Sequence, residues 1–287
     1  ESAELLEKLA NGGTDEMPLF TSCCPAWVNF CEKNMPEVVP YLSTCRSPMQ
    51  MFASVIKENH KHSPRKHYHV AVMPCTAKKA EAAREEFRSD AGPDTDFVIT
   101  TQELIQMIKE SGIVFDELEP EAVDMPFGTM SGAGVIFGVT GGVTEAVLRR
   151  ITYDKSPAAL RAIAFKGVRG DEGVKEAEVA YGDRTLKIAV VSGLGNARKI
   201  IERIKAGEHY DFVEVMACPG GCVCGAGQPF ALRDEKELRG KGLYSADRMS
   251  SIKRSEENPL MISLYNGLLK GKVHELLHVH YGAKEAE

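Results

Sequence analysis

The sequence predicts an α/β protein of two lobes, each a small twisted, mostly parallel sheet flanked by helices. The chain has 287 residues, which is more than most single hydrophobic cores hold, so two lobes are expected. Short apolar runs rich in β-branched residues alternate along the chain with helical patterns. Turn residues follow each run closely, as they do in the short loops of α/β folds.

The first unit begins with the apolar run Val70 to Met73, which predicts a buried parallel strand. A second run, Phe97 to Ile99, precedes the helical pattern TTQELIQMIKESG. In that pattern Thr100 and Glu103 have the spacing of a capping box, so a helix is expected to follow the strand directly.

The second unit has two more apolar runs, Lys187 to Val191 and Phe212 to Met216, which also predict buried parallel strands. Between them lies NARKIIERIKAG, in which three isoleucines fall on one helical face. Asn196 is the expected N-cap and Gly207 the expected stop, and the whole segment predicts a βαβ unit.

The two lobes are expected to meet near residue 160, giving a first lobe of residues 1–160 and a second of residues 161–287. Here the helical pattern GGVTEAVLRRI gives way to a polar connection. The chain begins with Glu1 inside the helical pattern ESAELLEKLANGG, which suggests that a preceding part of the first lobe is missing or belongs to another chain. The segment GKVHELLHVHYGAKEAE predicts a terminal helix with a short polar end.

Composition argues against several classes of function. The net charge is −6, and no run of Lys and Arg lies beside aromatic residues, so no nucleic-acid partner is expected. No stretch of about 18 apolar residues exists, and no secretory signal is recognisable, so no membrane span is expected. A cytoplasmic location is expected, with a periplasmic one possible because the natural start of the protein is not in the sequence.

Eight cysteines are too few for a disulfide scaffold, and they cluster early and late in the chain. Three segments carry the chemistry: TSCCPAW, MPCTAK and MACPGGCVCGAGQP. Soft thiolates select zinc, copper(I) or iron-sulfur clusters. Because glycines around Cys218 and Cys222 let the backbone approach a bulky group, the last segment favours a cluster over a single zinc ion. Cys31, Cys45 and Cys224 are instead expected to be buried small apolar residues, and the three histidines of HELLHVH are left out of the site.

The adjacent Cys23 and Cys24 point in divergent directions, so one of them is expected to be a spare thiol beside a metal. Such a thiol is a candidate proton carrier. Lys78 follows Cys75 by three residues, and its ammonium could donate hydrogen bonds to an anionic ligand.

The three segments resemble, in the right order, the signature motifs of the iron-only hydrogenases: TSCCPxW, MPCxxKxxE and ExMACPGGCxxGxGQP. Glu81 and Glu214 complete the second and third motifs. The resemblance also covers SGAGVIFGVTGGVTEA, KEAEV and the HELLHVHYG ending, and so spans essentially the whole chain.

This resemblance implies a [4Fe-4S] cluster joined to a two-iron subcluster with CO, CN and dithiolate ligands, in the cleft between the lobes. Cys24, Cys75, Cys218 and Cys222 would hold the cubane, and Cys222 would bridge to the two-iron unit. Lys78 would bind a cyanide ligand. The pocket around the two-iron unit would be lined by Pro74, Met73, Met216 and Phe137.

The resemblance also implies reversible oxidation of H2 to protons and electrons. Cys23 would be the proton-donating thiol, with a route to solvent through Ser43, Glu4 and Glu1. Electrons would be exchanged with a ferredoxin-like or other iron-sulfur carrier, in a missing domain or a separate subunit. Maturation proteins would assemble the two-iron unit.

Three other interpretations remain. A structural zinc explains four thiolates but not Lys78, the cysteine pair or the GAGQP run. A hydrogenase-like iron-sulfur assembly protein would keep the cubane cysteines without the details of TSCCP and GQP. A sensory hydrogenase without rapid turnover would lack the spare cysteine. Dinucleotide binding by the glycine-rich segment 131–142 is disfavoured, because its spacing is one residue off the fingerprint, and close packing is expected there instead.

Overall fold

The computed structural model describes residues 1–11, 17–89, 92–124, 127–152, 158, 169 and 173–282. Its main sheet has four strands in the order β1-β8-β7-β6, and a second sheet pairs β2 with β5. A third, antiparallel pair joins β3 and β4. The strands are β1 (Leu19–Phe20), β2 (Val70–Met73), β3 (Arg88–Ser89), β4 (Gly92–Pro93), β5 (Phe97–Thr100), β6 (Val174–Tyr181), β7 (Arg184–Ser192) and β8 (Phe212–Met216).

Helices flank both sheets, and the pairing within the sheets is mostly parallel. β1, β8 and β7 run parallel, as do β2 and β5, whereas β6 is antiparallel to β7. The helices are α1 (Ser2–Ala10), α2 (Pro25–Asn34), α3 (Pro48–Asn59), α4 (Ala77–Ala82), α5 (Thr101–Glu110), α6 (Gly132–Val135), α7 (Gly142–Ile151), α9 (Leu194–Lys205), α10 (Arg233–Met249), α11 (Pro259–Asn266) and α12 (Val273–Leu277). The predicted α/β fold is therefore confirmed.

The main sheet is buried on both faces because its side chains alternate between two apolar clusters. Ala189 and Val191 of β7 pack with residues of α2 and α9. Ile188 and Val190 of the same strand pack with residues of α1 and α7. The period of two along a strand thus explains how one apolar run supports two layers of helices.

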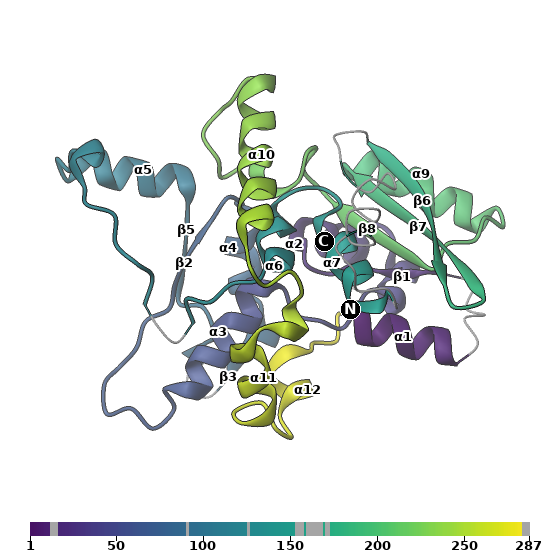
Figure 1. Cartoon of the computed structure of the whole chain (residues 1–287), viewed down its shortest axis with the longest axis horizontal. Coiled ribbons are helices and arrows are strands. Elements are labelled where there is room, and N and C mark those ends of the chain that lie inside the picture. Colours follow the sequence, from purple (N-terminus) through teal and green to yellow (C-terminus); the bar gives the residue numbers. More distant parts are fainter. Residues whose placement is uncertain are drawn as a thin grey trace.

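The small sheet lies on the opposite side of the molecule from the main sheet. Figure 1 shows β2, β5 and α5 on one side, β6 to β8 with α9 on the other, and α6 and α10 between them. The intervening layer is fixed by Arg149 of α7, whose guanidinium donates to both carboxylate oxygens of Asp247 in α10 at 2.8 Å. This bidentate, buried pair joins α7 to α10.

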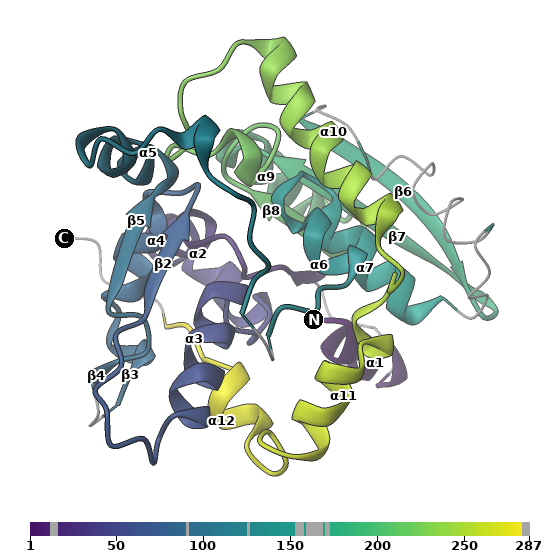
Figure 2. The same cartoon turned by 60° about the vertical axis from the view of Figure 1, so that its left-hand side comes forward.

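The C-terminal part of the described chain packs back on the first half. Helix α12 lies against α3, as Figure 2 shows. The residues after α12 form a backbone bridge with the segment before α3, in which Val279 N donates to Thr44 O at 2.7 Å and Arg46 N donates to Leu277 O at 2.9 Å. This bridge brings His278 next to Cys45.

Most local predictions are confirmed. The strand-helix-strand unit β7-α9-β8 is present with parallel strands, and Gly207 ends the helix with φ +100°. The capping box of Thr100 and Glu103 forms at the start of α5. The helices at both ends of the chain and after Gly141 are also where the sequence predicts them, and only residues 283–287 of the polar end lie outside the described part.

Three local predictions are wrong. The N-cap of α9 is Gly193 rather than Asn196, whose side chain instead donates to Ser192 O from within the first turn. Strand β2 is not buried, because Val70 and Val72 are 54% and 44% exposed. Cys224 is half-buried rather than buried.

The lobe boundary near residue 160 falls among residues outside the described part and stays a prediction. The described sheets nevertheless combine distant parts of the chain. Strand β1, at Leu19–Phe20, pairs with β8 at Phe212–Met216 in the main sheet. The two sheets therefore do not correspond simply to the two halves of the sequence.

Candidate metal centre and proton route

The cysteines expected to bind metal follow three strands that belong to both sheets. Cys24 is the N-cap of α2, shortly after β1. Cys75 follows β2, and Cys218 follows β8. In parallel sheets, ligands are typically bound beyond the carboxyl ends of the strands, and all three cysteines lie at such ends.

The loop that follows β2 and the loop that follows β8 are in direct contact, and glycines in the second loop make this contact possible. Gly227 N donates to Pro74 O at 3.0 Å. A Cβ atom at Gly225 would lie 2.1 Å from Pro74 O, and one at Gly227 would lie 2.7 Å from Cys75 N. The glycines of the third motif are therefore needed for its loop to pack on the second motif.

The same loop contacts the glycine-rich segment before α7. Gly221 has φ +88°, and a Cβ atom there would lie 2.6 Å from Thr140 N. Close packing, as expected for segment 131–142, also holds at Gly142, where a Cβ atom would meet Ile136 O at 1.8 Å. A side chain at Gly221 would push the cysteine loop away from this segment, and one at Gly142 would push α7 away from the turn at Ile136.

The four thiols interact electrostatically with one another. Burial is the main cause that raises the pKa of Cys222 to about 12, with smaller contributions from Cys24, Cys75 and Cys218, and Lys78 acts in the opposite direction. Burial also raises the pKa of Cys24 and of Cys218, and Cys75 adds to both shifts. The thiols of Cys24, Cys218 and Cys222 therefore hold their protons, which a metal has to displace when it binds.

Backbone amides surround the sulfur atoms. The backbone N-H groups of Ala217 and Trp27 act to lower the pKa of the Cys24 thiol, and that of Ala226 acts to lower the pKa of Cys218. Backbone N-H groups near sulfur tune the reduction potential of iron-sulfur clusters. The surroundings therefore suit thiolates that carry a redox-active cluster.

The spacing of the thiols excludes a single tetrahedral ion. Zinc held by thiolates at about 2.3 Å would bring the sulfurs within about 3.8 Å of each other. Among the described residues, only Glu4, Cys45 and His278 place three potential ligand atoms within 4.8 Å of one another. The four thiols interact but lie too far apart for one ion, so they fit a larger cluster.

Lys78 lies beside this group of thiols. Its ammonium donates to Glu81 Oε2 at 2.7 Å and to Cys23 O at 3.3 Å, and it interacts electrostatically with Cys24 and Cys222. The pair is buried, with side-chain exposures of 10% and 2%. An ammonium has three donors, so one donor of Lys78 is left for an anionic ligand.

Cys23 lies near two acidic groups as well as near two of the four thiols, Cys24 and Cys222. Burial raises the pKa of its thiol well above the ordinary value, and the charges of Glu1, Cys24 and Glu214 raise it further. Glu1 is fixed at this point by a hydrogen bond from Ser22 N to its Oε1 at 3.3 Å. Cys23 therefore keeps its proton and lies next to a carboxyl group.

Ser43 and Glu4 form a second polar pair. Ser43 Oγ donates to Glu4 Oε2 at 2.5 Å, while Thr44 donates to Glu4 Oε1 through both its N-H and its hydroxyl. Burial acts to raise the pKa of Glu4, but these hydrogen bonds outweigh it and hold the pKa below its ordinary value. The charge of Glu1 acts on the Cys23 thiol, while Ser43 bonds Glu4, so Glu1 is a candidate for the group next to Cys23; the order of the route stays a prediction.

Glu214 is a functional candidate that the sequence reasoning named only as a motif residue. It is fully buried, and it accepts hydrogen bonds from Gly141 N, Thr144 N and Thr144 Oγ1 at 2.7 to 2.8 Å. Burial raises its pKa to about 7 although these hydrogen bonds lower it. The signal for it was a charged residue inside the apolar run that became β8.

The four expected pocket-lining residues have different surroundings. Met216 is 2% exposed at the end of β8, and Pro74 contacts the cysteine loop. Phe137 is half-buried in the turn before α7. Met73 packs against the cluster of Met49, Ala82 and Val98.

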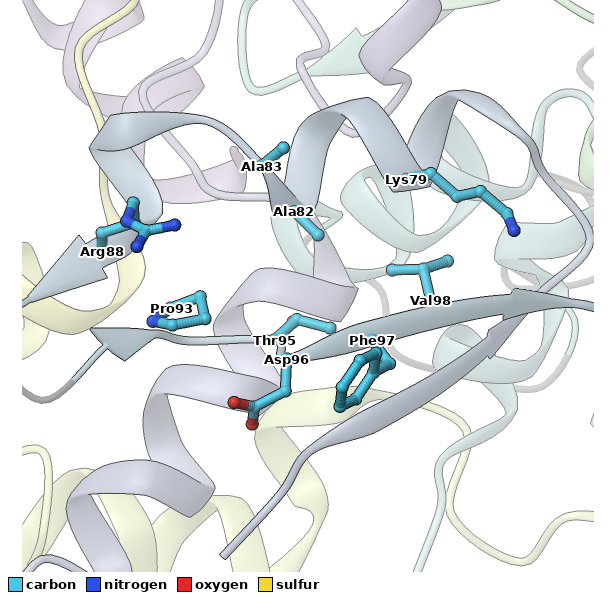
Figure 3. Close-up of a pocket in the computed structure, with 9 residues that line it drawn as sticks. All are labelled: Lys79, Ala82, Ala83, Arg88, Pro93, Thr95, Asp96, Phe97 and Val98. Atoms are coloured by element: carbon cyan, nitrogen blue, oxygen red, sulfur yellow. The ribbon is translucent and has the colours of Figure 1, made fainter.

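The pocket in Figure 3 is separate from the cysteines. It lies between α4 and β5 and is lined by Lys79, Ala82, Ala83, Arg88, Pro93, Thr95, Asp96, Phe97 and Val98. None of these residues is a thiol or one of the expected site residues. It is therefore not the metal centre.

Known proteins similar to this chain were found by sequence and by structure. The family described as "Iron only hydrogenase large subunit, C-terminal domain" matches residues 1–226, and "Iron hydrogenase small subunit" matches residues 233–284. The NADP-reducing hydrogenase subunit HndD of Solidesulfovibrio fructosivorans is 44% identical over 98% of this chain and 50% of that protein. The chain thus spans about half the length of the hydrogenases that it matches.

Two further relatives are a hydrogenase of known structure and an iron-sulfur assembly protein. The apo [FeFe]-hydrogenase HydA1 from Chlamydomonas reinhardtii is 38% identical with a TM-score of 0.82, covering 99% of this chain and 81% of that one. The cytosolic iron-sulfur assembly component 3 of Rattus norvegicus is 33% identical over 94% of this chain and 60% of that protein.

Proposed function

The chain belongs to the iron-only hydrogenase family, and we propose that it catalyses the reversible oxidation of H2 to protons and electrons at an iron centre held by its cysteines. Cys24, Cys75, Cys218 and Cys222 would hold a [4Fe-4S] cluster, and Cys222 would also hold the attached two-iron unit with its CO, CN and dithiolate ligands. When bound, this group supplies the place where H2 is split or formed and the path by which electrons leave. The spacing of the four thiols and their amide surroundings support the assignment.

The protein binds this group, keeps water away from it and provides a route for protons. Lys78 donates its remaining hydrogen bond to an anionic ligand of the two-iron unit. The half-buried side chains of Pro74, Met73 and Phe137 and the buried Met216 keep water out of the pocket. Low local polarity strengthens the hydrogen bond from Lys78.

Protons move along a row of residues that begins at Cys23. The thiol exchanges its proton with the carboxyl group of Glu1, and Ser43 and Glu4 continue the route outward. Glu4 has a pKa below its ordinary value, so at neutral pH it is ionised and able to accept a proton. The observation that carries the proposal is the group of Glu1 near the Cys23 thiol and the hydrogen-bonded Ser43–Glu4 pair, because a protein that only holds a cluster has no need of it.

A ferredoxin-like or other iron-sulfur carrier, in another domain or subunit, exchanges electrons with the cluster. No helix in the described part of the chain could cross a membrane. The cytoplasmic location stays a prediction, since one relative is a periplasmic [Fe] hydrogenase large subunit from Nitratidesulfovibrio vulgaris.

The test is to load the protein anaerobically with its iron cofactors and measure H2 evolution from a reduced dye, together with infrared spectra. CO and CN bands with turnover are expected. An iron-sulfur assembly protein or a sensory protein, the other functions that the family allows, would bind the cubane and give little or no H2. Four zinc-bound thiolates and no such bands would contradict the proposal altogether.

A further inference from the structure

Three potential metal ligands lie close together outside the group of four cysteine thiols. Glu4 comes from α1, Cys45 from the segment before α3, and His278 from the residue that follows α12. Cys45 Sγ lies 3.7 Å from Glu4 Oε2, and His278 Nδ1 lies 3.9 Å from Glu4 Oε1. The three ligand atoms all lie within 4.8 Å of one another.

The backbone holds these residues in place. Cys45 and His278 face each other in the bridge between their segments, and Arg46 Nε donates to His278 O at 3.0 Å. Cys45 N donates to Ser43 Oγ at 3.1 Å, which fixes the backbone that carries the thiol.

The spacing and the donor types suit a zinc-like ion. Tetrahedral zinc has bonds of about 2.0 to 2.3 Å, which puts neighbouring ligand atoms about 3.3 to 3.5 Å apart. Cys45 Sγ and His278 Nδ1 lie 3.7 and 3.9 Å from different oxygens of Glu4, and one set of three ligand atoms lies within 4.8 Å, so an ion would have to draw the ligands closer together. One thiol, one imidazole and one carboxylate favour zinc over calcium or magnesium, which prefer oxygen ligands throughout.

An ion bound by these three residues would affect the proposed proton route. Glu4 is the outer carboxylate of the proposed proton route, and it is now hydrogen-bonded to Ser43. A carboxylate oxygen bound to a dication can no longer accept a proton. Glu4 and Cys45 lie in the part matched by the large-subunit family and His278 in the part matched by the small-subunit family, so the group exists only where both parts are present.

We propose that Glu4, Cys45 and His278 bind a zinc-like divalent transition-metal ion, and that this ion blocks the proton route by occupying Glu4. Binding depends on the geometry of these three residues alone. The effect on turnover rests on the proposed function.

The binding test uses the iron-loaded protein under anaerobic conditions. Calorimetric titration with Zn²⁺ is expected to show one site per chain, and ¹¹³Cd²⁺ is expected to give a resonance typical of mixed sulfur, nitrogen and oxygen ligands. Cys45→Ala and His278→Ala should each weaken binding at least tenfold. His274→Ala is the matched control, because its ring lies next to that of His278, at 4.7 Å, but outside the group.

Unchanged affinity in both Cys45→Ala and His278→Ala would overturn the site. So would an all-sulfur ¹¹³Cd resonance with loss of iron, which would mean that the ion had entered the cubane site. The inhibition test compares H2 evolution with and without Zn²⁺ within each variant. Turnover of the unaltered chain should fall over the same Zn²⁺ range that fills the site, and this fall should be absent in Cys45→Ala.

The two proposals fail in different ways. Zinc binding at the three residues without inhibition would overturn the blocking effect and leave the hydrogenase function standing. Iron-loaded protein without any H2 turnover would overturn the proposed function, and the calorimetric titration would still decide the metal site.

Discussion

Cys23 and Cys24 are neighbours in the chain but have different surroundings. The backbone amides of Ala217 and Trp27 act to lower the pKa of the Cys24 thiol, which also interacts with Cys75, whereas the thiol of Cys23 interacts with Glu1 and Glu214. One residue is thus arranged as a ligand and the other as a carrier of protons. The difference arises because successive side chains at the start of a helix point in different directions.

Replacing each of the two cysteines should therefore have a different effect. Cys23→Ala should keep the iron content near normal and remove most H2 turnover, because a methyl group carries no proton. Cys24→Ala should lower the iron content, since one of four cluster ligands is lost. Iron analysis and dye-linked H2 evolution measure both. Cys23→Ala protein without a cubane, beside normal Cys24→Ala protein, would reverse the two roles.

Lys78 is expected to hold the two-iron unit, but its ion pair with Glu81 complicates any single substitution. Removing only Lys78 would leave a buried carboxylate unpaired, which commonly costs about 3 to 5 kcal/mol of stability. The informative change is the double variant Lys78→Gln with Glu81→Gln, with Glu81→Gln alone as the control.

The double variant should keep the cubane and hold the two-iron unit poorly. A hydrogen bond between charged groups contributes about 1.5 to 3 kcal/mol, so retention should weaken by about one to two powers of ten. Infrared intensity of the CO and CN bands per cubane measures retention. Normal loading with unshifted CN bands would mean that Lys78 faces elsewhere.

At the scale of elements, Glu214 of β8 fixes the start of α7. Its carboxylate accepts hydrogen bonds from two amides at the helix N-terminus, where a negative charge is favoured. The same segment packs on the loop that carries Cys218 and Cys222 through Gly221. Helix α7 thus ties the main sheet to the metal centre.

Glu214→Gln should destabilise the protein by about 1 to 3 kcal/mol, because its amide group would face backbone donors instead of accepting from them. The effect should depend on pH. Burial raises the pKa of Glu214 from the ordinary 4.5 to about 7, so between these values the folded chain binds the proton and the unfolded chain does not. Stability of the unaltered chain therefore falls as pH rises through this window.

Glutamine does not titrate, so the stability gap between the two proteins should shrink as pH rises from about 5 to 8, by up to about 3 kcal/mol. Urea unfolding at both pH values measures it. A gap that stays constant would mean that Glu214 is ionised in the folded chain throughout this range.

At the scale of the whole molecule, the four ligand cysteines connect the two sheets. Cys75 follows a strand of the small sheet, while Cys218 and Cys222 follow a strand of the main sheet. A cluster bound by all of them would crosslink the two sheets.

Iron loading should therefore raise the melting temperature of the protein. A ligand present at a hundred times its dissociation constant adds about 2.7 kcal/mol of stability, which amounts to several degrees in a domain of this size. Anaerobic thermal scans with and without iron measure the change. Cys224→Ala is the control, since it removes a thiol from the same loop and should leave the increase intact; equal melting temperatures with and without iron would contradict the crosslink.

The sequence by itself determined the features that depend on near neighbours in the chain. The capping box of α5, the β7-α9-β8 unit and the stop at Gly207 follow from local hydrogen bonds and side-chain periodicity. The motif spacing identified the cysteine segments and the family. Asn196 shows where local reasoning fails. Asparagine is a favourable N-cap residue, but the N-cap of α9 is Gly193, directly after β7.

Only the tertiary structure decided the contacts between distant segments. It put Glu1 beside Cys23 and Ser43 beside Glu4, and it brought His278 to Cys45 across more than two hundred residues. It also left Val70 and Val72 exposed, since β2 lies in a sheet of only two strands. These outcomes depend on how both sheets and the C-terminal segment pack, and no local pattern encodes that packing.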